Sequence, residues 1–64
     1  MKRYNVTVVF DRLNSAGVME KKTQRQGTGI EAQSKEEAKK KYLKIFKENE
    51  PNRRKIHKVI VDLM

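Results

Sequence analysis

A chain of 64 residues carries 16 lysines and arginines against 8 acids, which gives a formal charge of +8, and it has no cysteine. This composition excludes disulfides and thiolate metal sites, the length excludes a second domain, and neither a bilayer-spanning run of roughly 20 apolar residues nor an apolar signal region is present. We therefore expect one cytoplasmic domain, residues 1–64, that binds no membrane and whose partner neutralises positive charge.

The first predicted element is a strand over residues 4–13, which are rich in β-branched and aromatic residues. Tyr4, Val6, Val8 and Phe10 recur at period two and point to one face of that strand. The alternate positions are mostly polar. This pattern predicts a sheet with one covered and one uncovered side.

A hairpin follows, because residues 14–17 (NSAG) are turn formers. Its return arm, residues 18–32, is polar and charged in the middle, which is typical of an edge strand. Gly27 and Gly29 lie within this arm. They indicate either a β-bulge or a close approach of the backbone to another group, and both interpretations stay open.

A helix is predicted to begin at Ser34, because Ser34 and Glu37 have the spacing of a capping box. Pro51 ends this helix, since the residue before a proline is driven out of the helical region. Its apolar residues recur at helical spacing and form a narrow stripe that we expect to face the sheet. The stripe consists of Ala38, Tyr42, Ile45 and Phe46, with Leu43 at its border.

The last predicted element is a strand over residues 56–64. Strict alternation puts His57, Val59, Val61 and Leu63 on one face and Ile56, Lys58, Ile60 and Asp62 on the other. The order strand, strand, helix, strand predicts an α+β domain of ββαβ type. Short connections give a three-stranded antiparallel sheet in the order 2-1-3, with the helix packed on one face.

Groups suited to catalysis are few. His57 is the only histidine, with no second ligand at metal spacing, and we expect a structural role for it. Glu36 and Glu37 match the positive end of the helix dipole, and adjacent helical positions do not converge on one point. The run Gln26–Gly29 lacks the spacing of a phosphate-binding loop. We expect no enzymatic activity, no metal site and no cofactor.

The basic residues are the candidate site, and we expect them to bind nucleic-acid phosphates, with RNA favoured over DNA. The aromatic residues are assigned to the core, so binding by shape and charge is expected without base stacking. A lysine-rich helix also keeps proteins soluble, and this second interpretation stays open. The three predicted clusters are Lys40, Lys44 and Lys47 on the helix, Arg53, Arg54 and Lys55 in the loop before the last strand, and Lys21, Lys22 and Arg25 on the edge arm.

Two runs, residues 30–42 (IEAQSKEEAKKKY) and residues 52–61 (NRRKIHKVIV), resemble the small archaeal ribosomal LX family. In that family a strand runs into an Ala-x-Ser-x-Glu-Glu-Ala helix start, and a basic loop leads into a final Ile-rich strand. The opening Lys2–Val6 and Phe10 are similar to its first strand, so the resemblance covers nearly the whole chain. It implies a compact sheet-and-helix domain that contacts large-subunit ribosomal RNA through residues such as Arg53, Arg54 and Lys55.

An alternative function comes from another class of protein. A short, basic chain without cysteine is also typical of a phage or mobile-element accessory protein that binds an acidic surface of a host or defence protein and inhibits or redirects it. The uncovered sheet face and the polar edge strand are then the candidate interface. The uncovered face is also the candidate surface for a dimer.

Overall fold

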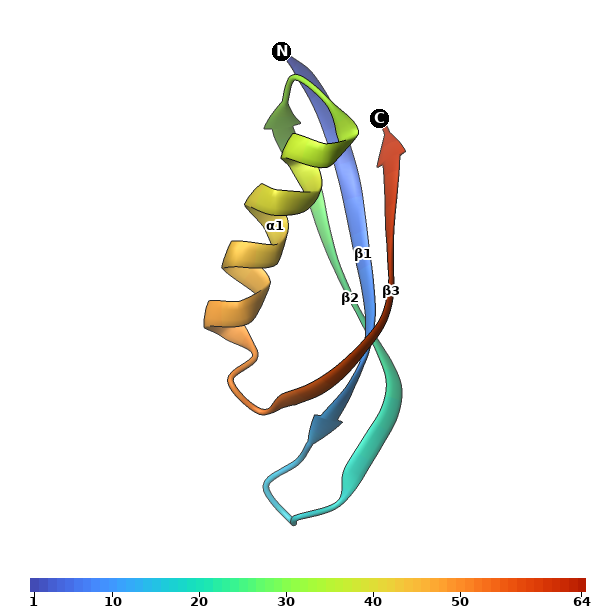
Figure 1. Cartoon of the computed structure of the whole chain (residues 1–64), viewed down its shortest axis with the longest axis vertical. Coiled ribbons are helices and arrows are strands. Elements are labelled where there is room, and N and C mark those ends of the chain that lie inside the picture. Colours follow the sequence, from blue (N-terminus) through green and yellow to red (C-terminus); the bar gives the residue numbers. More distant parts are fainter.

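A computed structural model describes all 64 residues and contains three strands and one helix (Figure 1). The elements are β1 (Lys2–Leu13), β2 (Met19–Ala32), α1 (Lys35–Asn49) and β3 (Arg53–Leu63). The strands form one antiparallel sheet in the order β2-β1-β3, and α1 lies across one face of it. The predicted α+β fold of ββαβ type and its strand order are confirmed. α1 is neither long nor apolar enough to span a membrane.

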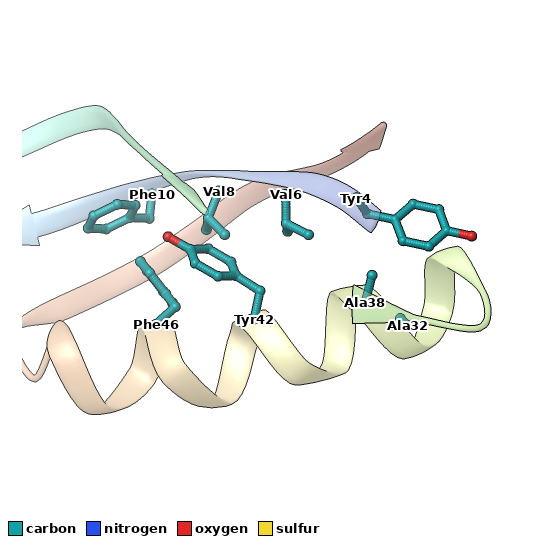
Figure 2. Packing of buried hydrophobic residues seen from close by; sticks show 8 residues of the cluster. All are labelled: Tyr4, Val6, Val8, Phe10, Ala32, Ala38, Tyr42 and Phe46. Carbon is teal, nitrogen blue, oxygen red and sulfur yellow. The ribbon is translucent and has the colours of Figure 1, made fainter. Parts of the chain in front are cut away.

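The core lies between β1 and α1 (Figure 2). Phe10 and Phe46 meet edge to face, with ring centroids 4.7 Å apart and an interplanar angle of 76°, which is a favoured geometry for aromatic pairs. Ile45 was predicted to belong to this core and does not, because its side chain is 47% exposed. The sheet covers the side of α1 that carries Ala38, Tyr42 and Phe46. Of the two residues that border this side, Leu43 is partly buried and Ile45 is exposed. The buried cluster comprises Tyr4, Val6, Val8, Phe10, Ala32, Ala38, Tyr42 and Phe46.

Side-chain and backbone caps fix both ends of α1. At the start, the Ser34 hydroxyl accepts a hydrogen bond from the Glu37 N–H at 3.2 Å. The Glu37 carboxylate contacts Lys41 Nζ at 3.4 Å, so it makes an i,i+4 pair in place of the reciprocal half of the predicted capping box. At the end, the Glu50 N–H donates to the Phe46 carbonyl at 2.9 Å. Glu50 thereby closes the last turn, one residue before Pro51.

The two glycines of β2 have different roles. A Cβ atom at Gly27 would overlap the ring of Tyr42, so the absence of a side chain lets α1 pack against the strand. Gly29 has a φ of +67° and lies where the β1–β2 register shifts by one residue, which is the left-handed geometry of a β-bulge. The predicted close approach of the backbone is therefore found at Gly27, and the predicted β-bulge at Gly29.

β3 differs from the prediction at its beginning and in its faces. It starts at Arg53, so Arg53, Arg54 and Lys55 belong to the strand and not to a preceding loop. Its register against β1 shifts at His57, because Val9 pairs with Lys58 while Phe10 pairs with Ile56. This extra residue turns Ile56 toward the core and leaves Ile60 on the uncovered face. The strict alternation expected over residues 56–64 is therefore wrong at Ile56 and His57.

Candidate nucleic-acid interface

Three lysines of α1, Lys40, Lys44 and Lys47, form a line on its outer surface, which we call the lysine row. Their spacing of four and three residues keeps them on one side of the helix. All three are exposed, and the buried residues of α1 occupy the opposite side. At a rise of 1.5 Å per residue the row spans about 10 Å along the helix axis. It presents three ammonium groups to solvent in one direction.

The basic start of β3 lies next to the end of this row, but its three residues do not share one role. Arg53 donates from Nη1 to the carbonyl oxygens of Lys47 and Glu50, at 3.3 and 3.1 Å. It therefore caps the carboxyl end of α1, where a cation is favoured by the helix dipole. Arg54 and Lys55 are exposed. Arg54 Nη1 donates to the neighbouring carbonyl oxygens of Asn52 and Arg53, at 3.3 and 3.2 Å, but these contacts are local and join no second element. Arg54 and Lys55 therefore keep their charge for a ligand, whereas Arg53 joins β3 to α1.

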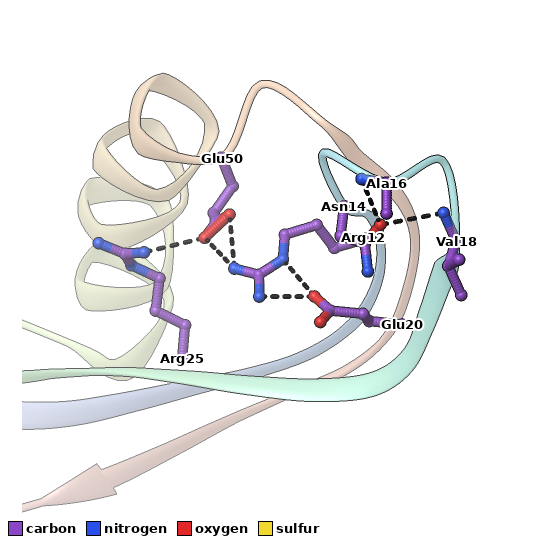
Figure 3. A network of polar contacts seen from close by, with 7 residues as sticks. All are labelled: Arg12, Asn14, Ala16, Val18, Glu20, Arg25 and Glu50. Carbon is purple, nitrogen blue, oxygen red and sulfur yellow. Dashed lines mark hydrogen bonds and ion pairs between the residues drawn. The ribbon is translucent and has the colours of Figure 1, made fainter.

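Arg25 of the predicted edge cluster also has an internal partner (Figure 3). Its Nη1 lies 2.9 Å from Oε2 of Glu50, whose side chain is only 7% exposed. Arg12 contacts the same carboxylate at 3.4 Å and binds Glu20 Oε1 through Nε and Nη2, at 2.9 and 2.7 Å. The Glu20 and Glu50 hydrogen bonds raise the pKa of Arg12 above its ordinary value. We call these four residues, Arg12, Glu20, Arg25 and Glu50, the Arg12 network.

The other two edge residues, Lys21 and Lys22, are exposed on the hairpin. Lys22 lies on the face of the sheet that α1 does not cover, because it lines a hollow with Val9. This hollow of about 360 Å³ is lined by Val9, Lys22, Gln24, His57 and Lys58. The structure thus separates Lys22 from the lysine row by the thickness of the sheet, and the three predicted clusters do not form one surface.

Asp11 and His57 meet at the edge of this hollow. His57 Nε2 lies 2.8 Å from Asp11 Oδ1, and the same oxygen accepts the Lys22 N–H at 3.0 Å. The His57 hydrogen bond, followed by that of the Lys22 N–H, holds the pKa of Asp11 below its ordinary value of 3.8. The second bond accounts for the unusual backbone of Lys22, whose φ is +52°. His57 therefore ties β3 to the β1–β2 hairpin, a role that agrees with a structural histidine.

We expect the stability of the fold to fall in acid through Asp11. Because its pKa is lower in the folded than in the unfolded chain, the ionised carboxylate stabilises the fold fully above the unfolded value of 3.8 and progressively less as the pH falls through the folded value. Urea midpoints from neutral pH to about pH 2 measure this loss. Asp11→Asn should remove part of the acid dependence, whereas Glu48→Gln, at an exposed acid without an ion pair, should retain it. Identical acid profiles for Asp11→Asn and the wild type would contradict this role.

Sequence reasoning missed the Asp11–His57 pair and the Arg12 network. Their members lie up to 46 positions apart, and no motif links them. The strand order, which places β1 between β2 and β3, brings Asp11 near His57 and Arg12 near Glu20, and the packing of the end of α1 on the sheet adds Glu50. The aromatic residues were assigned correctly, because Tyr4, Phe10, Tyr42 and Phe46 are all buried. No tyrosine or phenylalanine ring is therefore exposed for base stacking.

Internal ion pairs use only part of the basic charge. Four of the 16 lysines and arginines contact a carboxylate, which leaves twelve without one. The whole lysine row, Arg54 and Lys55 belong to these twelve. The four paired residues are Arg3, Arg12, Arg25 and Lys41.

No family model matches this chain, and no curated protein or solved structure matches it at a significant level. The resemblance to the ribosomal LX family therefore stays a prediction.

Proposed function

We propose that this protein is a non-enzymatic cytoplasmic binding protein that contacts the phosphate backbone of a nucleic acid through the lysine row together with Arg54 and Lys55. The observation that carries the proposal is the placement of unpaired cations. Three exposed lysines lie in one line on α1, and Arg53, which contacts the Lys47 carbonyl, joins the end of that line to the start of β3. Such a line of ammonium groups matches a chain of phosphates.

The mode of binding follows from the same groups. Lysine is a point charge on a flexible stem, so the row favours charge over base identity. The buried aromatic residues offer no platform for bases. We therefore propose recognition of backbone charge and shape with little dependence on sequence. The preference for RNA over DNA rests on the resemblance to the LX family.

Counterion release provides the test, because each phosphate contact adds to the slope of log Kobs against log salt concentration. Fluorescence anisotropy with labelled duplex RNA, duplex DNA and single-stranded RNA measures this slope. The triple variant K40A/K44A/K47A should bind the duplexes more weakly at every salt concentration, and its slope should be smaller by about 2–3. R54A/K55A should lower the slope further, and Arg53 is left intact because it caps α1.

A matched control separates the site from net charge. The variant K2A/K21A/K35A removes three exposed lysines outside the row, and it should keep most of the affinity and slope. Equal losses in the two triple variants would mean that only net charge matters and would overturn the assignment of the site. A wild-type protein that binds none of the three nucleic acids at low salt would overturn the proposed function. Binding to an acidic surface of another protein would then be the remaining alternative.

A further inference from the structure

The outer edge of β3 is an unpaired strand edge. In the strand order β2-β1-β3, β3 pairs with β1 on one side, and no element pairs with its other side (Figure 1). From Lys58 to Leu63 its register against β1 has no shift, so this stretch is regular. The edge of β2 is different, because Lys22 and Gly29 interrupt it with positive φ angles of 52° and 67°. Bulges of this kind discourage strand pairing, and β3 lacks them between residues 58 and 63.

The hydrogen-bonding groups along this edge can be assigned from one contact. The Met64 N–H donates to the Arg3 carbonyl at 2.9 Å, so residue 64 directs its backbone groups toward β1. In an antiparallel ladder this direction alternates from one residue to the next. Leu63, Val61 and Val59 therefore direct their N–H and C=O groups away from β1. These groups form a ready template for another strand.

We propose that a second copy of this chain occupies this edge, with the two β3 strands antiparallel about a two-fold axis at Ile60. Val59 then lies opposite Val61 of the partner subunit, and the two residues exchange backbone hydrogen bonds. Lys58 lies opposite Asp62 of the partner subunit on the face that α1 leaves uncovered, and the symmetry repeats this pair. Within one chain neither Lys58 nor Asp62 makes an ion pair. Pairing between copies gives each of these two side chains a partner of opposite charge.

Charge complementarity selects this register among the symmetric alternatives. An axis at Val59 places Lys58 opposite Ile60, and an axis at Val61 places Asp62 opposite Ile60. Only the axis at Ile60 sets opposite charges against each other and places the half-exposed Ile60 side chain, 39% accessible, against its own copy. Opposite charges and apolar pairs stabilise neighbouring strands, whereas mismatched pairs do not.

The resulting assembly is a six-stranded sheet in the order β2-β1-β3-β3-β1-β2. Because the two-fold axis is perpendicular to the sheet, both helices lie on the same side, and both lysine rows face the same direction. A strand pair of this length buries little surface, so self-association should be weak and visible only at high protein concentration. The dimer does not depend on nucleic-acid binding, and neither proposal requires the other.

Analytical ultracentrifugation without nucleic acid tests the proposal, over about 10 µM to about 2 mM protein. The wild type should approach twice the 7.6 kDa mass of the chain as its concentration rises. Asp62→Lys and Lys58→Asp each set like charges against each other, and each should sediment as a monomer. The double variant K58D/D62K restores opposite charges in exchanged positions and should recover the dimer.

Two controls complete the experiment. Glu48→Lys makes the same change in net charge as Asp62→Lys on an exposed helical residue, and it should dimerise as the wild type does. The variant K40A/K44A/K47A should also dimerise, which separates this result from the proposed function. Circular dichroism verifies that each variant is folded. A wild type that stays monomeric up to about 2 mM, a folded Asp62→Lys variant that still dimerises, or a folded double variant that stays monomeric would overturn the proposal.

Discussion

Phe46→Ala is expected to leave a large part of the protein unfolded at 25 °C. The Phe46 side chain is fully buried and packs edge to face against Phe10. Truncation of a buried phenylalanine costs about 3–5 kcal/mol, from lost burial and the cavity that remains. A domain of 64 residues has a total stability of only about 3–10 kcal/mol. Urea unfolding followed by circular dichroism should show a much lower midpoint, or no folded baseline at all.

Ile45→Ala is the matched control, because it lies one position away on the same helix. Its side chain is 47% exposed, so we expect a loss of about 1 kcal/mol or less. The comparison decides which side of α1 faces the sheet. Similar losses in the two variants would mean that the helix is rotated toward Ile45, as the sequence pattern alone had predicted.

The parts of the fold that could be predicted from sequence are those with a clear local period. Tyr4, Val6, Val8 and Phe10 recur at period two and form the buried face of β1, and β1, the strand richest in buried residues, lies at the centre of the sheet. Ala38, Tyr42 and Phe46 recur every four residues and fix the buried side of α1. The helical period alone could not show that Leu43 is partly buried and Ile45 is exposed. The width of a three-stranded sheet decides between them, and that width is a property of the assembled fold.

The start of β3 could not be predicted in the same way. Arg53, Arg54 and Lys55 follow a proline turn and have low strand propensity, so a loop was the natural expectation. Arg53 nevertheless pairs with Arg12 of β1 and caps α1, and these long-range contacts hold the segment in the sheet. The bulge at His57 could not be predicted either, because it depends on the register of β3 against β1. It lets Ile56 face the core and His57 reach Asp11.

Clusters along the sequence name the basic residues of the candidate site but not their arrangement in space. A list of cations also does not show which ones the fold itself uses. Arg25 contacts Glu50, 25 positions away, and Arg53 binds the backbone of α1. Arginine serves internal carboxylates and carbonyls well, because its planar group donates several hydrogen bonds at fixed angles. Most of the charge left for a ligand is therefore lysine.

Glu50 is the residue on which the Arg12 network depends. It is the only charged residue among the ten buried ones, and it lies where the end of α1 meets the sheet. Its carboxylate faces Arg12 from β1 and Arg25 from β2, which are partly exposed. A buried carboxylate is stable only when it is paired and hydrogen-bonded. Here two guanidinium groups meet this requirement, and the carboxylate holds three elements together (Figure 3).

Glu50→Ala should lower the free energy of unfolding by about 1–3 kcal/mol, because two neighbouring guanidinium groups lose their shared partner and the end of α1 loses its contact with the sheet. The loss stays below that of a fully buried pair, since Arg12 and Arg25 can turn toward water. Urea unfolding measures it, and the effect should persist at high salt because this carboxylate is shielded from solvent. Glu48→Ala removes an equal charge from an exposed position of α1 and should change stability by less than about 0.5 kcal/mol. If both variants lose the same small amount, Glu50 does not join α1 to the sheet.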